Sequence, residues 1–102
     1  MPRRIPIGPT DDLSPGEARI VALGDGREIA VFNVADSYYA IDNRCPHQGG
    51  ALGKGPLEGT IVTCPLHRFK IDLRDGVCPW NRVLRVKTYP VVVDAARVYV
   101  EV

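Results

Sequence analysis

The hydrophobic residues of this chain fall into short runs that are separated by turn-forming residues. Runs of this length, rich in Val, Ile and Tyr, are typical of β-strands. The pattern predicts strands at residues 3–7, 18–23, 27–34, 38–42, 60–63, 69–73, 84–93 and 97–102, with a loop or short helical turn at 9–16. Short strands at this spacing predict a small, antiparallel, all-β domain.

The turns between these strands carry their own signals. Gly24-Asp25-Gly26 lies between two apolar runs, which is a strong indication of a hairpin. Further turns are expected at 35–37, 74–76 and 94–96. Pro90 should mark a bulge or a sheet edge, because proline cannot donate to a β-ladder. Residues 43–60 are irregular and hold five glycines and two prolines, and ordered loops of this length are usually functional.

Length and charge narrow the function classes. We expect the 102 residues to form one domain, with no room for a second module. Thirteen Lys and Arg residues balance twelve Asp and Glu residues, so no general attraction to nucleic acid or to an anionic membrane is expected. No apolar stretch is long enough to span a bilayer, and Arg3-Arg4 precedes no signal-like segment, so we expect a cytoplasmic protein.

Four candidate metal ligands stand out in the irregular middle of the chain. Cys45-Pro46-His47 opens this region and Cys64-Pro65-Leu66-His67 closes it, using both histidines and two of the three cysteines. An odd cysteine count argues against a disulfide framework and for metal or thiol chemistry. Two thiolates and two imidazoles suit tetrahedral Zn²⁺, and they also suit a [2Fe–2S] cluster with two cysteines on one iron and two histidines on the other.

The composition of each half-site favours the two-iron cluster. Zinc fingers usually draw like ligands from each half, whereas here each loop supplies one cysteine and one histidine. Each loop can then give its cysteine to one iron and its histidine to the other. A structural zinc-binding module stays as the remote alternative.

The paired motifs resemble those of the Rieske family, with likeness running through 43–52, 62–67 and 69–76. The resemblance implies that Cys45 and Cys64 bind the inner iron and that His47 and His67 bind the outer iron near the surface. It implies one [2Fe–2S] cluster per chain. It also implies the Rieske fold over residues 1–102, a single domain of three antiparallel sheets in which two ligand loops form a cluster-binding subdomain at about 43–76.

Departures from relatives refine this expectation. Respiratory Rieske subunits carry a loop-joining disulfide where this chain has Gly50 and Leu66. They also carry a serine and a tyrosine that donate hydrogen bonds at the cluster, where this chain has Phe69 and Ile71. Hydrogen bonds to the cluster sulfurs raise the reduction potential. Because this chain has no hydroxyl donor at these two positions, we expect a reduction potential below zero. Arg68 stands where glycine often follows the second histidine ligand.

The resemblance implies electron transfer and no catalysis. Rieske oxygenases add a mononuclear iron with two further histidines and a carboxylate, and both histidines here are already committed. We therefore expect a low-potential Rieske-type ferredoxin that carries single electrons from a flavin-dependent reductase to an oxygenase or another acceptor. The alternative is the small subunit of NAD(P)H-dependent assimilatory nitrite reductase, whose large subunit would then be the acceptor. Residues 43–50, 63–67 and 87–91 are similar to that subunit too.

Two surface features remain open. The charged residues at 44–70 form a net basic set that could dock an acidic partner or could simply be solvated (Arg44, Lys54, Arg68 and Lys70 against Glu58). Cys78-Pro79-Trp80-Asn81 lies where the family often has a third loop that covers the cluster. The simpler expectation is that Trp80 belongs to the core and that Cys78 is a buried thiol rather than a ligand.

Overall fold

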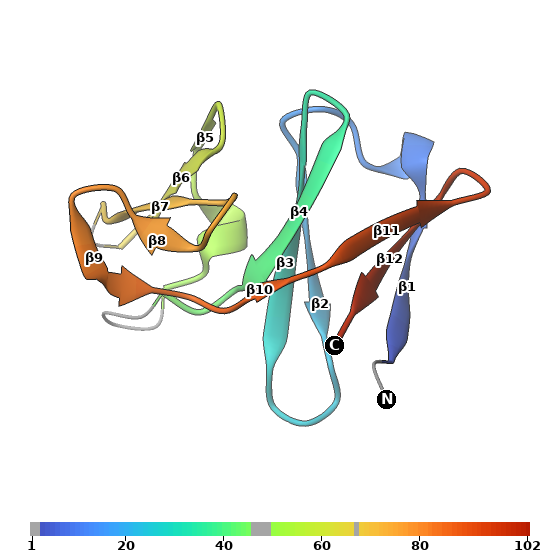
Figure 1. Ribbon diagram of the computed structural model, residues 1–102, viewed down its shortest axis with the longest axis horizontal. Coiled ribbons are helices and arrows are strands. Elements are labelled where there is room, and N and C mark those ends of the chain that lie inside the picture. Colours follow the sequence, from blue (N-terminus) through green and yellow to red (C-terminus); the bar gives the residue numbers. More distant parts are fainter. Residues whose placement is uncertain (1–2, 46–49, 67) are drawn as a thin grey trace.

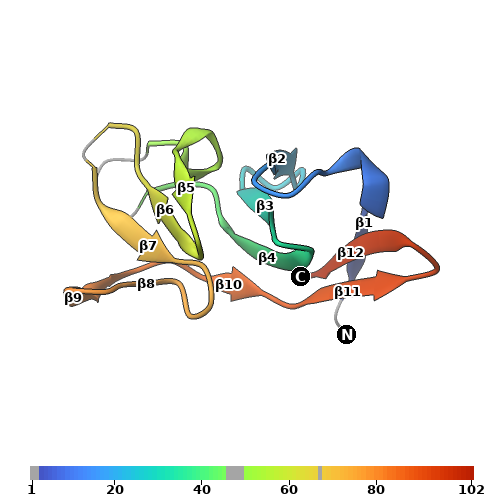
Figure 2. The same ribbon diagram turned by 90° about the horizontal axis from the view of Figure 1, so that it is seen from above.

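Three antiparallel sheets lie side by side along the long axis of the molecule (Figure 1). The computed structural model describes residues 3–45, 50–66 and 68–102, and within them the chain forms twelve strands and two single-turn 3₁₀ helices. The same order of sheets appears in the second view (Figure 2). The expected all-β architecture of three antiparallel sheets is therefore confirmed.

The middle sheet has the order β10-β4-β3-β2. Strands β2 (Ala18–Ala22) and β3 (Glu28–Val34) are joined through the predicted Gly24–Gly26 turn, and β4 (Ser37–Asp42) returns after two residues. Those two residues, Ala35 and Asp36, both have positive φ, as a two-residue hairpin of the type that matches strand twist requires.

Strand β3 lies between two hydrophobic cores and contributes side chains to both. Its side chains point alternately to opposite faces, and residues 29–33 are all at most 1% exposed. Ala30 and Phe32 pack into the core that contains the three cysteines, whereas Ile29 and Val31 pack into the core shared with the three-stranded sheet. The candidate site is thus supported from behind by a strand that is buried on both faces.

The outer sheets flank the middle sheet. The three-stranded sheet has the order β1-β12-β11 and joins β1 (Arg4–Pro9), which η1 (Thr10–Asp12) follows, to β12 (Arg97–Glu101). The five-stranded sheet, order β5-β6-β7-β8-β9, holds both sides of the second cysteine motif and forms the other end of the molecule (Figures 1 and 2). Its strands are β5 (Leu57–Glu58), β6 (Ile61–Thr63), β7 (Lys70–Asp72), β8 (Val77–Cys78) and β9 (Asn81–Arg85), with η2 (Leu52–Lys54) before them.

The prediction of one strand at 84–93 is wrong. The segment is divided among β9, β10 (Thr88–Tyr89) and β11 (Val91–Asp94), and each of these strands belongs to a different sheet. Pro90 lies between β10 and β11, both of which are edge strands, so its missing N–H costs no ladder hydrogen bond. Strands β5 and β8 were not predicted, because two residues are too few for a periodic signal.

Candidate metal centre

The first cysteine loop leaves the end of β4 and is closed by its own backbone. Arg44 and Ala51 form an isolated antiparallel bridge, and the Cys45 N–H donates to the Gly50 carbonyl at 2.8 Å. The Asn43 carbonyl accepts from the Leu52 N–H at 2.7 Å. These bonds bring the two ends of the loop together, and residues 46–49, including the predicted ligand His47, lie outside the described part.

The side chain of Asn43 holds the start of this loop through two hydrogen bonds. Its side chain is 3% exposed; its Oδ1 accepts from the Gly53 N–H at 2.7 Å and its Nδ2 donates to Glu28 Oε1 at 3.2 Å. Asn43 thus ties the loop to both η2 and β3. Its place two residues before Cys45 is the one feature of the sequence that points to Asn43.

The second cysteine loop repeats the closure of the first. The Cys64 N–H donates to the Phe69 carbonyl at 2.7 Å, so in both loops the cysteine N–H binds the carbonyl five residues further on. The Arg68 N–H also donates to the Cys64 carbonyl, at 2.9 Å. Strands β6 and β7 hold this loop through the Thr63–Lys70 pair. His67 lies outside the described residues.

The two loops touch at Gly50. A Cβ placed on Gly50 would lie 2.9 Å from Cys64 Sγ and 3.2 Å from the Leu66 side chain. Only a residue without a side chain lets the first loop come this close to the second. Gly50 thus brings the end of the first loop against Cys64 and Leu66 of the second loop, and the assignment of the four ligands stays a prediction.

The environment of the two thiols fits metal ligation. Cys45 is 2% exposed and Cys64 is fully buried, in one core cluster with Cys78. All three cysteines are described, and none is joined to another by a disulfide. No group of three or more His, Cys, Asp or Glu that could hold a metal ion converges within residues 3–45, 50–66 and 68–102, and the predicted ligands His47 and His67 lie outside these ranges. A buried thiolate needs a compensating cation, and an iron–sulfur core supplies one.

Comparison with known families decides whether these candidate ligands belong to a zinc site or to a [2Fe–2S] cluster. The model of the Rieske-like [2Fe-2S] domain matches residues 4–101. The chain belongs to this family. Its cofactor is a [2Fe–2S] cluster, and the structural zinc module is excluded.

Relatives of this Rieske chain are electron carriers. It is 36% identical over 89 residues to the ferredoxin component of the naphthalene 1,2-dioxygenase/salicylate 5-hydroxylase systems of Ralstonia sp., covering 86% of this chain and 85% of the relative. The solved ferredoxin of carbazole 1,9a-dioxygenase from Nocardioides aromaticivorans IC177 superposes with a TM-score of 0.87 at 34% identity, covering 95% of each chain. The expected Rieske-type electron-transfer role is confirmed: the chain is an electron-transfer protein and not a catalytic enzyme.

A third relative bears on the alternative function. A protein described as an NADH-dependent nitrite reductase small subunit from Mycobacterium tuberculosis superposes with a TM-score of 0.91 at 28% identity, covering 100% of this chain and 96% of that protein. The Rieske fold alone therefore does not distinguish a dioxygenase ferredoxin from a nitrite reductase small subunit.

Within the described residues, no helix is long and apolar enough to cross a membrane.

The segment at 78–81 differs from the simpler expectation in one respect. Cys78 is fully buried, as expected for a small apolar thiol, but Trp80 is 67% exposed and the prediction that it belongs to the core is wrong. The reason is its place in the two-residue turn between β8 and β9, at the end of the sheet where the second cysteine loop begins. Lys70 Nζ lies 6.0 Å from the centre of the indole ring.

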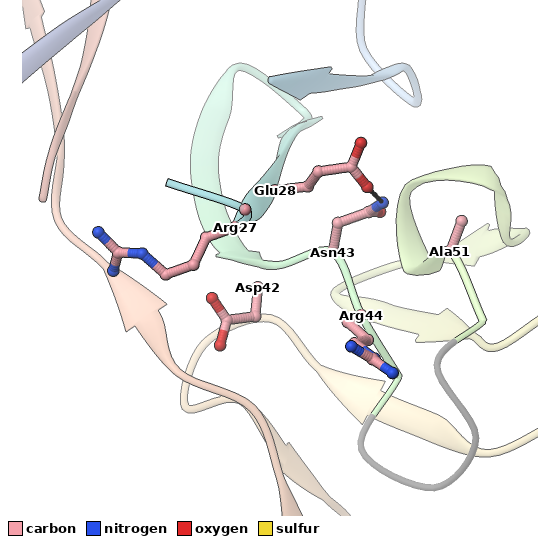
Figure 3. A pocket seen from close by; sticks show the side chains of 7 residues that line it. Arg27, Glu28, Asp42, Asn43, Arg44 and Ala51 are labelled. Atoms are coloured by element: carbon pink, nitrogen blue, oxygen red, sulfur yellow. Dashed lines mark hydrogen bonds between the residues drawn. The ribbon is translucent and has the colours of Figure 1, made fainter. Parts of the chain in front are cut away.

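A polar pocket of about 410 Å³ lies between the first Rieske loop and the middle sheet (Figure 3). Arg27 and Asp42 lie on one side of it, and Arg44 and Ala51 lie on the other. Two arginines and two carboxylates line it together, so their charges compensate and favour neither a cation nor an anion.

Beside this pocket, Tyr89 locks β10 to β4. Its hydroxyl donates to Asp42 Oδ1 at 2.5 Å. Burial, and then the hydrogen bond to the Asp42 carboxylate, raise the pKa of Tyr89 to about 12.

Proposed function

We propose that this chain is a low-potential Rieske ferredoxin in which Cys45 and Cys64 bind one iron and His47 and His67 bind the other. The observation that carries the proposal is the convergence of two buried cysteines on loops that are closed by the same hydrogen bond and touch at Gly50. We also propose one cluster per chain, held in a subdomain at about 43–76 of a single domain, and the presence of one such pair of loops supports this. The cluster supplies one-electron chemistry when bound.

The protein side of this chemistry is exclusion of water and control of hydrogen bonding. The cysteine sulfurs lie in an apolar core with Val62 and Ile71, both fully buried. Ile71 and Phe69 carry no hydroxyl, so neither side chain can donate a hydrogen bond to a cluster sulfur. Fewer donors and an apolar setting disfavour the extra negative charge of the reduced state, which supports a potential below zero.

The partners follow from the relatives. We propose a flavin-dependent reductase as the donor and an oxygenase as the acceptor, acting in the cytoplasm. A solved complex of reduced oxygenase and oxidized ferredoxin in carbazole 1,9a-dioxygenase contains a chain that superposes with a TM-score of 0.89 at 27% identity, covering 95% of this chain and 91% of that one. The ferredoxin components of naphthalene and p-cumate dioxygenase systems, both from Pseudomonas putida, support the same class of acceptor.

Ligand replacement tests the assignment. Replacement of any one proposed ligand is expected to abolish the EPR signal of the reduced cluster, whose average g value lies below the free-electron value. The variants are Cys45→Ser, His47→Ala, Cys64→Ser and His67→Ala. Cys78→Ser is the matched control, because Cys78 is equally buried and in the same core, and it should keep that signal. A cluster that survives replacement of any of the four residues, or is lost only in the control, contradicts the ligand set. A redox titration with a strongly positive midpoint contradicts the low potential.

A second candidate function is the small subunit of NAD(P)H-dependent nitrite reductase, favoured by the superposition over the whole chain. A subunit should co-purify in fixed stoichiometry with a large flavin and sirohaem protein and should support nitrite reduction. A free carrier should purify alone and should reduce an oxygenase component. Co-expression with each acceptor, followed by size-exclusion chromatography, distinguishes the two.

A further inference from the structure

Arg68 occupies a backbone conformation that favours glycine. Its φ is +59°, in the left-handed region where a β-carbon is disfavoured, and its N–H donates to the Cys64 carbonyl. The residue is exposed, so packing does not explain the side chain. Strained backbone conformations cluster at functional sites, and hairpin turns such as the one at Ala95 and Ala96 also contain them. Arg68 is thus a charged side chain kept, at a conformational cost, directly beside a cluster loop.

Trp80 and Lys70 lie at the same end of the five-stranded sheet. Lys70 starts β7 opposite Thr63, and the β8–β9 turn that carries Trp80 is at that same end, because Asp72 and Val77 pair at the other end. The 6.0 Å contact between Lys70 Nζ and the indole confirms that they are neighbours. A large aromatic side chain that is 67% exposed beside a lysine has the composition of an interface anchor.

The register of the sheet separates the charges. Glu58 pairs with Ile61 and Asp72 pairs with Val77, so these carboxylates lie at the end away from the cluster loop, and Asp75 lies in the turn between β7 and β8. Within the described part of the chain, the ion pairs involve Arg4, Arg27 and Arg74, so no carboxylate neutralises Arg68 there. The cluster end of the sheet is therefore positively charged.

We propose that Arg68, Lys70 and Trp80 form one docking surface, the cluster-end surface, for an acidic redox partner protein with an apolar recess for the indole. The proposal rests on the proposed function, because it places this surface beside the electron exit. Arg68 and Lys70 attract the acidic partner and orient it, and Trp80 anchors it. The surface joins Trp80 to two members of the expected basic set and gives Arg68 a role.

Small charged oxidants test the proposed electrostatic role of the cluster-end surface. The reduced holoprotein is mixed with ferricyanide or with hexaamminecobalt(III) in a stopped-flow instrument at several ionic strengths. Arg68→Asn removes the charge and keeps a residue that tolerates left-handed backbone. One unit charge acting on a trivalent ion about 10 Å away changes a rate about four- to fivefold at 0.01 M ionic strength and less than about twofold at 0.15 M. We expect slower oxidation by ferricyanide and faster oxidation by the cobalt complex.

Matched controls separate this effect from a change in potential or in folding. Arg68→Lys should stay within twofold of wild type, and Arg97→Gln, at the far end of the molecule in β12, should change neither rate. A changed driving force would move both oxidants in the same direction. Equal effects of Arg68→Asn and Arg97→Gln with ferricyanide would overturn the electrostatic role of the cluster-end surface.

A protein acceptor tests the anchor. Reduced holoprotein is titrated against the oxygenase component of a naphthalene 1,2-dioxygenase system. Trp80→Ala should raise the half-saturating concentration at least tenfold and leave the limiting rate unchanged, while Val93→Ala, half-exposed in β11, should leave both unchanged. Equal behaviour of the two variants overturns the anchor. If wild type reduces no oxygenase, the proposed acceptor is wrong, and the ferricyanide comparison still decides the surface.

Discussion

Replacing Gly50 by alanine tests whether the two loops must touch for the cluster to bind. The backbone of Gly50 is not in the left-handed region, so the effect comes from space alone. The new Cβ would lie 2.9 Å from Cys64 Sγ, where ordinary contacts are 3.4–4 Å. Leu66 is 63% exposed and can move aside, but Cys64 is fully buried and cannot. Overpacking of this kind costs about 1–3 kcal/mol.

We expect Gly50→Ala to lower the free energy of unfolding by that amount and the melting temperature by roughly 4–8 °C per kcal/mol. Cluster content, measured as iron per chain and by EPR, should fall as well, because displacement of the Cys64 thiol misplaces a proposed ligand. Gly50→Ala/Leu66→Ala should not recover the loss, since Leu66 is the movable neighbour. Full cluster content together with an unchanged melting temperature in Gly50→Ala would refute the reasoning.

Three further predictions concern stability. Ala95→Asn/Ala96→Gly should raise the free energy of unfolding by about 1–2 kcal/mol in thermal melts, because both alanines have positive φ in the β11–β12 turn; a decrease would contradict this. Asn43→Ala should cost about 1–3 kcal/mol in urea unfolding and reduce cluster content, since it leaves the partly buried Gly53 N–H without its acceptor; an effect no larger than that of an exposed substitution such as Val93→Ala would show that this bond is dispensable. Folding raises the pKa of Tyr89 from 10.0 to about 12, so the stability that its protonated hydroxyl contributes is complete below pH 10 and is lost as the pH rises from 10 to 12. In Tyr89→Phe, the free energy of unfolding should not show this loss, and a pH titration should lack the last step in tyrosinate absorbance.

The parts of the fold that were predictable are those that local chemistry decides. Gly24-Asp25-Gly26 predicts a hairpin because glycine accepts positive φ, and both glycines have it. The spacing of Cys45 and Cys64 predicts that two loops meet, and Gly50 is where they touch.

The parts that were not predictable depend on distant partners. Residues 84–93 look like one strand because nothing within them shows that three sheets compete for the backbone. Trp80 looked like core because size and hydrophobicity predict burial on average, whereas a two-residue turn at a sheet end offers nothing to bury against. The strain at Arg68 is visible only once its φ is known.

The division of residues 81–94 among all three sheets has a consequence for how the molecule comes apart. Because this short segment supplies one strand to each sheet, the strands β9, β10 and β11 are linked directly along the backbone. Loss of pairing in one sheet therefore frees one end of the strand that pairs in the next sheet. Denaturation should therefore be all-or-none, with iron release and loss of β-sheet circular dichroism sharing one midpoint. Cleavage of the single peptide bond between Val86 and Lys87, which separates β9 from β10, should abolish that cooperativity without removing any residue.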